Sequence, residues 1–223
     1  MAKVFVVGAQ GRMGGLVCDL VDATEGLELA GRYDVANIAE LDELAPAVDL
    51  VIDFSQPAAL PHVAAYVERT GASLVSGTTG LGASDFARLE ALGKNARVVW
   101  SSNYSLGVAV LRRVAKEAAR ALDGWEIEIV ETHHKMKLDA PSGTAKTIAE
   151  QVGEVSGRDV VCHSMRGGTV AGTHEVHYFG TDEEITLTHR AASRQIFVNG
   201  AVACGKRLLA VEPGYYTFDD LMF

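Results

Sequence analysis

The segment from residue 131 to residue 145, ETHHKMKLDAPSGTA, gathers the side chains of this chain that are best suited to acid–base chemistry. Histidine exchanges protons near neutral pH, and a lysine held away from water can do the same. Four side chains in it carry or accept positive charge: His133, His134, Lys135 and Lys137. Pro141 and Ser142 then mark the start of a helix, whose free backbone N–H groups also attract anions. The segment therefore predicts a site that binds carboxylates and moves protons.

Residue types alone leave another interpretation open, in which these histidines and lysines are solvated surface charges. A zinc site is disfavoured, because two adjacent histidines with no nearby cysteine or third histidine have poor ligand spacing. A nucleophilic role for Ser142 is also disfavoured, since S-G-T lacks the G-x-S-x-G pattern of a nucleophile elbow. If a strand extends this far, His133 and His134 point to opposite faces of it.

A glycine-rich turn near the N-terminus provides a second candidate site. Gly8, Gly11 and Gly14 form a G-x-x-G-x-x-G pattern directly after an expected strand and at the start of an expected helix. Glycine permits a tight turn and lets the backbone approach a pyrophosphate, which the helix N-terminus then binds. The spacing departs by one residue from the usual G-x-G-x-x-G pattern, and a glycine-rich turn can also simply shorten a connection.

Asp34 favours the interpretation of that turn as a dinucleotide site. It follows Gly14 by 20 residues, where an acidic residue commonly binds the adenosine ribose. The alternative is an ordinary turn aspartate in YDVAN. The carboxylate favours NADH, because it repels the 2′-phosphate of NADPH. Arg12 and Arg32 are close enough in sequence to offset this repulsion, so the preference stays open.

The elements expected around these residues alternate between strand and helix over residues 1–104. Strands are expected at residues 4–7, 27–33, 49–54, 73–76 and 97–100, and helices at 13–23, 58–70 and 83–92. The strands are short and apolar without alternation, as in a parallel sheet covered on both faces. This pattern predicts a Rossmann-like, doubly wound α/β domain. The polar segments DFSQP, SGTTG and SSNYS follow strand ends, where such sheets bind ligands, although each also fits an ordinary turn.

The pattern changes after residue 103. Helices are expected at residues 106–122, 144–155 and 194–209, and strands at 125–132, 160–165, 174–179 and 184–189. Alternation in WEIEIVE and EITLTH indicates strands with one covered face. We therefore expect a first domain at residues 1–104, completed by the tail 206–223, and a second α+β domain with an open mixed sheet at 105–205.

Composition excludes several other classes of protein. The net charge of −9 disfavours nucleic acid and anionic membranes as partners. The chain has no apolar run of the roughly 18 residues needed to span a bilayer and no signal-peptide pattern, so we expect it in the cytoplasm. Cys18, Cys162 and Cys204 are scattered, so we expect them to be reduced and buried, with no metal site among them.

Taken together, these motifs make the chain resemble the dihydrodipicolinate reductase family over nearly its whole length. The most specific match is E-x-H-H-x-x-K-x-D-A-P-S-G-T-A, which fits residues 131–145 at every fixed position. Other family motifs match G-x-x-G-R-M-G at 8–14, D-F-[ST]-x-P at 53–57, G-T-T-G at 77–80, N-[FY]-S at 103–105 and S-R at 193–194.

The resemblance implies a two-domain reductase that uses NADH or NADPH to reduce 4-hydroxy-tetrahydrodipicolinate, with loss of water, in the diaminopimelate route to lysine. It implies a substrate-binding second domain whose sheet usually builds a homotetramer. It implies proton transfer by His133 and Lys137, and binding of the substrate carboxylates by His134, Gly143, Thr144 and Arg194. It implies cofactor binding by Gly8, Ala9, Gln10, Gly11, Arg12, Met13, Asp34, Phe54, Gly77, Thr78, Thr79, Ser101, Ser102, Asn103 and Tyr104.

Two departures from the family pattern leave the choice of cofactor open. The chain is short, from trimmed loops such as 37–47, and Val35 stands where some members carry an arginine that holds a 2′-phosphate. Two other functions compete with the reductase. A dinucleotide-binding sensor on the same fold would not need His133 together with Lys137. Other Rossmann reductases, such as aspartate or homoserine dehydrogenases, should lack the H-H-x-x-K-x-D-A-P-S-G-T run.

Overall fold

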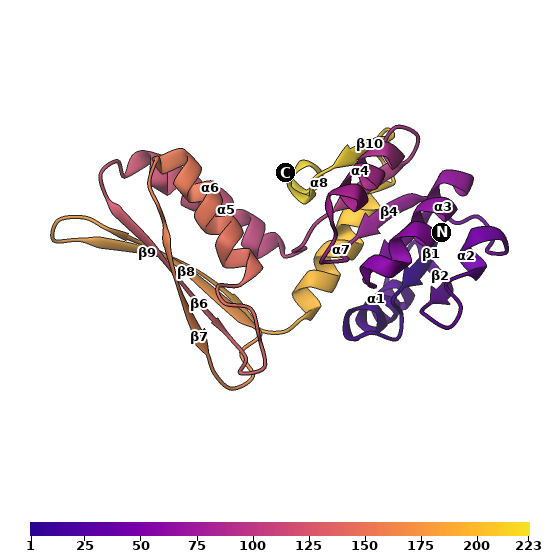
Figure 1. The fold of residues 1–223 in the computed structure, drawn as a ribbon, viewed down its shortest axis with the longest axis horizontal. Coiled ribbons are helices and arrows are strands. Elements are labelled where there is room, and N and C mark those ends of the chain that lie inside the picture. Colours follow the sequence, from indigo (N-terminus) through magenta and orange to yellow (C-terminus); the bar gives the residue numbers. More distant parts are fainter. The chain divides into compact units, whose positions relative to one another are not determined.

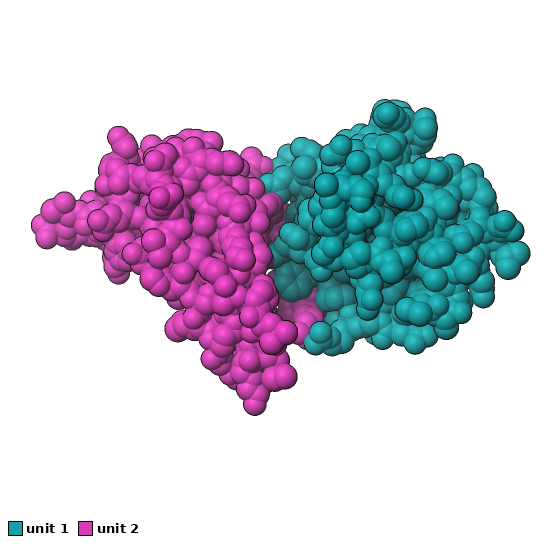
Figure 2. Space-filling view, viewed as in Figure 1, with its two compact units in different colours: residues 1–104, 197–223 teal, residues 105–196 magenta.

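The computed structural model describes residues 1–223 and divides into two compact units. The first unit contains residues 1–104 and 197–223, and the second contains residues 105–196 (Figure 2). No helix is long and apolar enough to cross a membrane.

The first unit is built on a six-stranded parallel sheet with the order β10-β5-β4-β3-β1-β2. Its strands are β1 (Ala2–Val7), β2 (Leu27–Tyr33), β3 (Leu50–Asp53), β4 (Ser73–Ser76), β5 (Arg97–Trp100) and β10 (Gly214–Tyr216). From β1 the chain adds β2 on one side and then β3, β4 and β5 on the other. The order therefore reverses between β1 and β3, which is the usual ligand position in such sheets.

Helices cover both faces of this sheet, so the predicted doubly wound α/β fold is confirmed (Figure 1). One face packs against α2 (Glu40–Glu43), α3 (Leu60–Thr70, after the 3-10 turn Pro57–Ala59) and α4 (Ala83–Leu92). α1 (Arg12–Ala23) packs on β1 and β2. All residues of the two central strands, β3 and β4, are buried, as the uninterrupted apolar runs predict.

The chain returns to the first unit at Phe197, inside α7 (Gln195–Leu208), which is earlier than the expected residue 206. The helix belongs with the first sheet because its apolar face packs there. A Cβ at Gly205 would lie only 2.8 Å from the Leu50 side chain, so helix and sheet are in close contact. The short elements α2, β10 and α8 (Phe218–Met222) were not predicted, because three to five residues show no periodicity.

The second unit is a four-stranded mixed sheet with the order β7-β6-β8-β9. Its strands are β6 (Glu126–His133), β7 (Val161–Arg166), β8 (Gly172–Phe179) and β9 (Glu184–Ala191). β6 pairs in parallel with β7 and antiparallel with β8, which pairs antiparallel with β9. The expected open mixed sheet is therefore confirmed.

One face of this second sheet is covered by α5 (Leu106–Ala121) and α6 (Gly143–Ser156), which lie side by side (Figure 1). Alternate residues of β6, among them Ile127 and Ile129, join side chains of both helices in one apolar core. The opposite face is not covered within the unit and exposes Val161, Met165 and Phe179. The predicted alternation of β6 thus separates a buried face from an open one.

Candidate functional site

The glycine-rich turn after β1 packs so closely that two of its glycines leave no room for a side chain. A Cβ at Gly14 would lie 2.0 Å from the carbonyl oxygen of Gly8. Gly8 has a φ of +77°, and its Cβ would lie 2.5 Å from the carbonyl oxygen of Phe54. Gly11 caps the N-terminus of α1, with no side chain covering the free N–H groups there. The backbone therefore forms the close-packed, anion-attracting turn that a pyrophosphate requires.

Asp34 is held against this turn by one backbone hydrogen bond, and a second one orients its carboxylate locally. Its carboxylate accepts the N–H of Gln10 at 2.9 Å and the N–H of Val35 at 2.8 Å. One oxygen is used by each bond, and a carboxylate has about four acceptor sites, so further donors can still bind. The hydroxyls of a ribose are donors of this kind.

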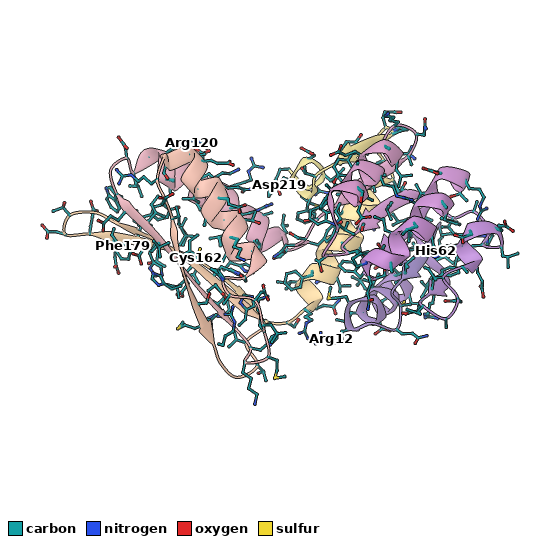
Figure 3. All side chains as sticks on the ribbon, in the orientation of Figure 1. Arg12, His62, Arg120, Cys162, Phe179 and Asp219 are labelled. Atoms are coloured by element: carbon teal, nitrogen blue, oxygen red, sulfur yellow. The ribbon has the colours of Figure 1, made fainter.

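A pocket of about 580 Å³ lies at the reversal point between β1 and β3. Its volume falls in the range of ordinary ligand sites. His62 on α3 lines it too, with Nδ1 at 2.9 Å from an Asp42 carboxylate oxygen (Figure 3). Five of the predicted cofactor residues line the pocket: Gly8, Gln10, Gly11, Asp34 and Phe54.

Asp53 ties the turns after β3 and β4 together from inside. It is completely buried and accepts hydrogen bonds from Ser55 (2.5 Å), Thr78 (2.8 Å) and Ser76 (3.2 Å). Burial raises the pKa of Asp53, and these hydrogen bonds oppose the rise. The three turns were expected at one edge of the sheet, but the sequence pattern did not predict that Asp53 links two of them. Thr78 is buried, so its hydroxyl serves the loop rather than facing solvent.

The remaining predicted cofactor residues lie in the turns after β1, β4 and β5 or in the first turn of α1. Arg12 and Ser102 are exposed, and Arg12 begins α1 (Figure 3). Tyr104 is buried, and its hydroxyl donates to the Ser76 carbonyl oxygen at 2.8 Å. Its side chain therefore stabilises the end of β4. The other members of this group are Ala9, Met13, Gly77, Thr79, Ser101 and Asn103.

The carboxyl end of β6 positions the acid–base residues of the second unit. Glu131 and His133 lie on the face of β6 that is turned toward the helices, and both are buried. β6 ends at His133, so His134 lies in the following turn and is only half buried. The two adjacent histidines thus have different environments.

Glu131 is the centre of a buried hydrogen-bond network. Arg166 of β7 donates to both of its oxygens, at 2.7 and 2.9 Å, and the backbone N–H of Ser142 donates at 3.1 Å. The Nδ1 atom of His133 lies 2.5 Å from the carboxylate. Burial alone would raise the pKa of Glu131, but the hydrogen bonds outweigh it and lower the pKa to about 2. The carboxylate is therefore ionised at neutral pH.

His174 of β8 lies beside His133, and His189 of β9 pairs with His174. The ring of His174 is 5.2 Å from that of His133, and burial lowers the pKa of His174 to about 4. Burial also lowers the pKa of His133, with Glu131 acting against this effect. Arg166 and His174 were not among the predicted site residues. Their contacts depend on strand register, and no local pattern encodes it.

Lys137 lies in the turn between β6 and α6. Its Nζ donates to Asp139 at 2.8 Å, and this hydrogen bond lowers the pKa of Asp139. The backbone N–H of Lys137 donates to the carbonyl of His134 at 3.1 Å, so the turn is locally closed. Arg166 also donates to the Asp139 carbonyl at 2.6 Å, which fixes the turn to the buried network.

The N-terminus of α6 brings the predicted carboxylate-binding residues to the same end of the sheet. Ser142 caps the helix by accepting the N–H of Ala145 at 3.2 Å. Gly143, the first helical residue, is exposed and Thr144 is half buried. β9 ends at Ala191, which pairs with Gly172 beside the His133 ring, and the exposed Arg194 follows three residues later. The N-terminus of α6, through Ser142 and Glu131, and the charge of Lys137 thus lie close to His133.

Comparisons with known proteins agree over the full chain. Family models described as the N-terminus and the C-terminus of dihydrodipicolinate reductase match residues 2–104 and 107–222. A 4-hydroxy-tetrahydrodipicolinate reductase of Stenotrophomonas maltophilia is 41% identical, over 99% of this chain and 97% of that protein. One from Caldanaerobacter subterraneus subsp. tengcongensis is 35% identical, over 100% of this chain and 98% of that protein.

Solved structures share the fold. A dihydrodipicolinate reductase from Paenisporosarcina sp. TG-14, described as dipicolinate-bound, has a TM-score of 0.83 at 21% identity, and the alignment covers 100% of both chains. A probable dehydrogenase from Thermotoga maritima has a TM-score of 0.66 at 12% identity, covering 98% of this chain and 92% of that one. At such identities the likeness concerns the fold alone.

Proposed function

The chain belongs to the dihydrodipicolinate reductase family, and we propose that it reduces 4-hydroxy-tetrahydrodipicolinate to tetrahydrodipicolinate, with loss of water, using NADH or NADPH. This reaction is a step in the diaminopimelate route to lysine. The protein is an oxidoreductase with a nicotinamide dinucleotide as cofactor. The observation that carries the substrate proposal is the set of His133, Lys137 and the α6 N-terminus at one end of the second sheet.

The first unit is the dinucleotide-binding domain in this proposal. Its glycine turn suits a pyrophosphate, because Gly8 and Gly14 are packed too closely for side chains and the turn therefore presents backbone atoms at these positions. The anchored carboxylate of Asp34 suits ribose hydroxyls. Thr78, Ser101 and their neighbours follow the adjacent strands β4 and β5, where the nicotinamide half would bind.

The second unit binds the substrate in this proposal. Two carboxylates on a ring require two groups of donors. The site offers Lys137 and Arg194 as cations, the ring N–H of His134, and the backbone N–H groups of Gly143 and Thr144. The relative from Paenisporosarcina is described as binding dipicolinate, a ring of this class. The cations orient the ring and stabilise negative charge that develops on it.

His133 and Lys137 move the protons. The nicotinamide, when bound, supplies the hydride. His133 has its Nδ1 committed to Glu131, so proton exchange with substrate is left to Nε2. Lys137 carries its proton on Nζ beside Asp139 and can deliver it to the reduced ring. Both residues together distinguish a reductase from a sensor that only binds the dinucleotide.

Substitution of the two residues tests these roles. We expect His133→Ala and Lys137→Ala each to lower kcat by about 10²-fold or more, the usual contribution of an acid–base group. The affinity for NADH should stay unchanged, because the cofactor pocket lies in the other unit. Lys94→Ala, at an exposed lysine of the first unit, is the control. Near-normal turnover in both site variants would rule out the assignment.

The proposed assembly is a homotetramer formed through the open face of the second sheet. Val161 and Met165 are each 52% exposed on β7, and Phe179 is exposed on β8. Large apolar side chains exposed on an uncovered sheet face favour burial against another copy. Light scattering should give about four times the chain mass of 23.7 kDa, and Met165→Lys should reduce that mass. A monomer at micromolar concentration would contradict the proposal.

A further inference from the structure

We propose that Glu131 and Arg166 act as a pair of positioning residues for His133. In this proposal the Glu131 carboxylate fixes the tautomer of the imidazole. The positive charge of the Arg166 guanidinium opposes the tendency of that carboxylate to favour the doubly protonated, cationic ring. The working nitrogen of His133 is then Nε2. The inference deepens the proposed function, because it explains how His133 is held in its acid–base role.

Four donor atoms surround the Glu131 carboxylate, and the Ser164 side chain of β7 adds a further hydrogen bond. One oxygen accepts Arg166 Nη2 at 2.7 Å and the Ser142 N–H at 3.1 Å. The other accepts Arg166 Nη1 at 2.9 Å and lies 2.5 Å from His133 Nδ1. An ionised carboxylate can only accept hydrogen bonds, so Nδ1 must carry the proton. In the neutral ring, Nε2 therefore holds the lone pair.

Strand register explains why Arg166 can reach this carboxylate. His133 pairs with Arg166 across the parallel ladder of β6 and β7, and Glu131 pairs with Ser164. Cys162, four residues before Arg166 on β7, lies on the same side of the strand. Its thiol donates to the Ala145 carbonyl oxygen of α6 at 3.8 Å. Arg166 thus points to the helix-covered face, as Glu131 does. A bidentate arginine fork is the geometry that best holds a buried carboxylate in one orientation.

The groups around His133 act on its pKa in opposite directions. Burial lowers this pKa, Glu131 raises it, and the charges of Lys137 and Arg166 lower it. His174 of β8, the remaining titratable neighbour, is neutral near pH 7 because its own pKa is about 4. Removing Glu131 or Arg166 should therefore move the titration of His133 in opposite senses. A purely structural role for the pair would not produce opposite shifts.

The test combines nitrogen NMR of isotope-labelled histidine with the pH dependence of kcat/KM. His133→Asn identifies the His133 signal. In the wild-type protein we expect the neutral ring to carry its proton on Nδ1. In Glu131→Gln the neutral His133 ring should no longer carry its proton on Nδ1 alone, and His133 should titrate at lower pH. In Arg166→Met, His133 should titrate about one pH unit or more higher. The corresponding limb of the kcat/KM profile should move with each titration.

Matched controls come from the Glu117–Arg120 pair on the exposed side of α5. Glu117→Gln and Arg120→Met make the same chemical changes in the same unit and should leave the His133 signal and the kcat/KM profile unchanged. A neutral wild-type His133 with its proton on Nε2 would overturn the proposal. Shifts of the same sign in Glu131→Gln and Arg166→Met, or no shift in either, would also overturn it.

The wild-type tautomer decides the proposal even if one variant fails to fold, because that measurement needs no substitution. Arg166→Lys provides a milder second variant, which keeps the charge but loses the fork. We expect it to shift the titration less than Arg166→Met does. The NMR measurements need no turnover. An inactive protein with the Nδ1 proton and opposite shifts would contradict the proposed reaction while leaving the positioning pair intact.

Discussion

Acidification from about pH 7.5 to about pH 5 should destabilise the second unit, with His174 responsible for a large share of the loss. The ring is buried, with only 4% of the residue exposed, and its Nδ1 has no hydrogen-bond partner. Its pKa is about 4 in the folded protein because burial penalises the charged form, against an ordinary value of 6.5. Between these two pKa values, the unfolded chain therefore binds a proton at His174 that the folded chain does not bind.

The sign and size of the effect follow from this difference. Between the two pKa values the unfolded state holds more protons, so the free energy of unfolding falls as the pH falls from about 6.5 toward 4. The complete shift is worth about 3.4 kcal/mol, and the part realised at pH 5 is about 2 kcal/mol. Glu131 does not contribute in this window. Its lowered pKa stabilises the fold above 4.5, and that contribution is lost only as the pH falls further toward 2.

Urea unfolding of the second unit measures this effect. Trp100 lies in the first unit and Trp125 in the second, so a Trp100→Phe background leaves Trp125 fluorescence as the reporter. His174→Gln removes the titration and retains an amide that can contact Ser142, which lies 3.3 Å from His174 Nε2. His133 and His189 also have lowered pKa values, and they titrate in both proteins. The difference between the two curves therefore isolates His174.

We expect the parent protein to lose about 2 kcal/mol more than His174→Gln between the two pH values. Parallel curves for the two proteins would refute the reasoning, because His174 would then bind protons equally well in the folded and unfolded states. A loss in the variant that exceeds the loss in the parent would refute it as well.

Three further predictions concern single residues. Gly14→Ala should lower NADH affinity at least tenfold and cost about 1–3 kcal/mol of stability, because the Cβ would meet the Gly8 carbonyl oxygen at 2.0 Å. Gly15→Ala is the control, because its Cβ would have its nearest contact at 3.8 Å. It should change neither the NADH affinity, measured by fluorescence titration, nor the stability, measured by thermal unfolding. Asp34→Ser should shift the ratio of kcat/KM for NADPH over NADH upward by about tenfold, since it removes a charge that repels the 2′-phosphate; an unchanged ratio would contradict this role. Ser105→Ala should lower stability by about 1 kcal/mol in thermal unfolding, because Ser105 caps α5 through Val108 at 3.2 Å, and an unaltered melting temperature would count against the cap.

The sequence predicted those features that depend on local pattern. Uninterrupted apolar runs indicated the buried parallel strands, and alternation in residues 125–132 indicated the half-covered β6. The spacing of Gly14 and Asp34 predicted a turn and a carboxylate that meet in the structure through Gln10. Each of these signals lies within a few turns of helix or one strand, where periodicity and turn chemistry are strong.

Other features depend on contacts between distant parts of the chain, which no local pattern records. Glu131 and Arg166 are 35 residues apart and meet only through the register of β6 and β7. Asp53 bonds Ser76 and Thr78 across two strand ends, so its role as a link between turns was not visible. The return of α7 to the first sheet likewise depends on which core its apolar face fits. Cys18 and Cys204 are buried as predicted, whereas Cys162 is half buried.

The most direct test of the account is a coupled assay of the purified chain. Dihydrodipicolinate synthase generates the substrate in place, and the loss of NADH and of NADPH is followed separately by absorbance. We expect at least one reduced dinucleotide to be consumed in a reaction that requires both the synthase and this protein. The rate of that loss should fall about 10²-fold or more with Lys137→Ala. No loss of either dinucleotide would contradict the central claim that the chain is a reductase of this substrate.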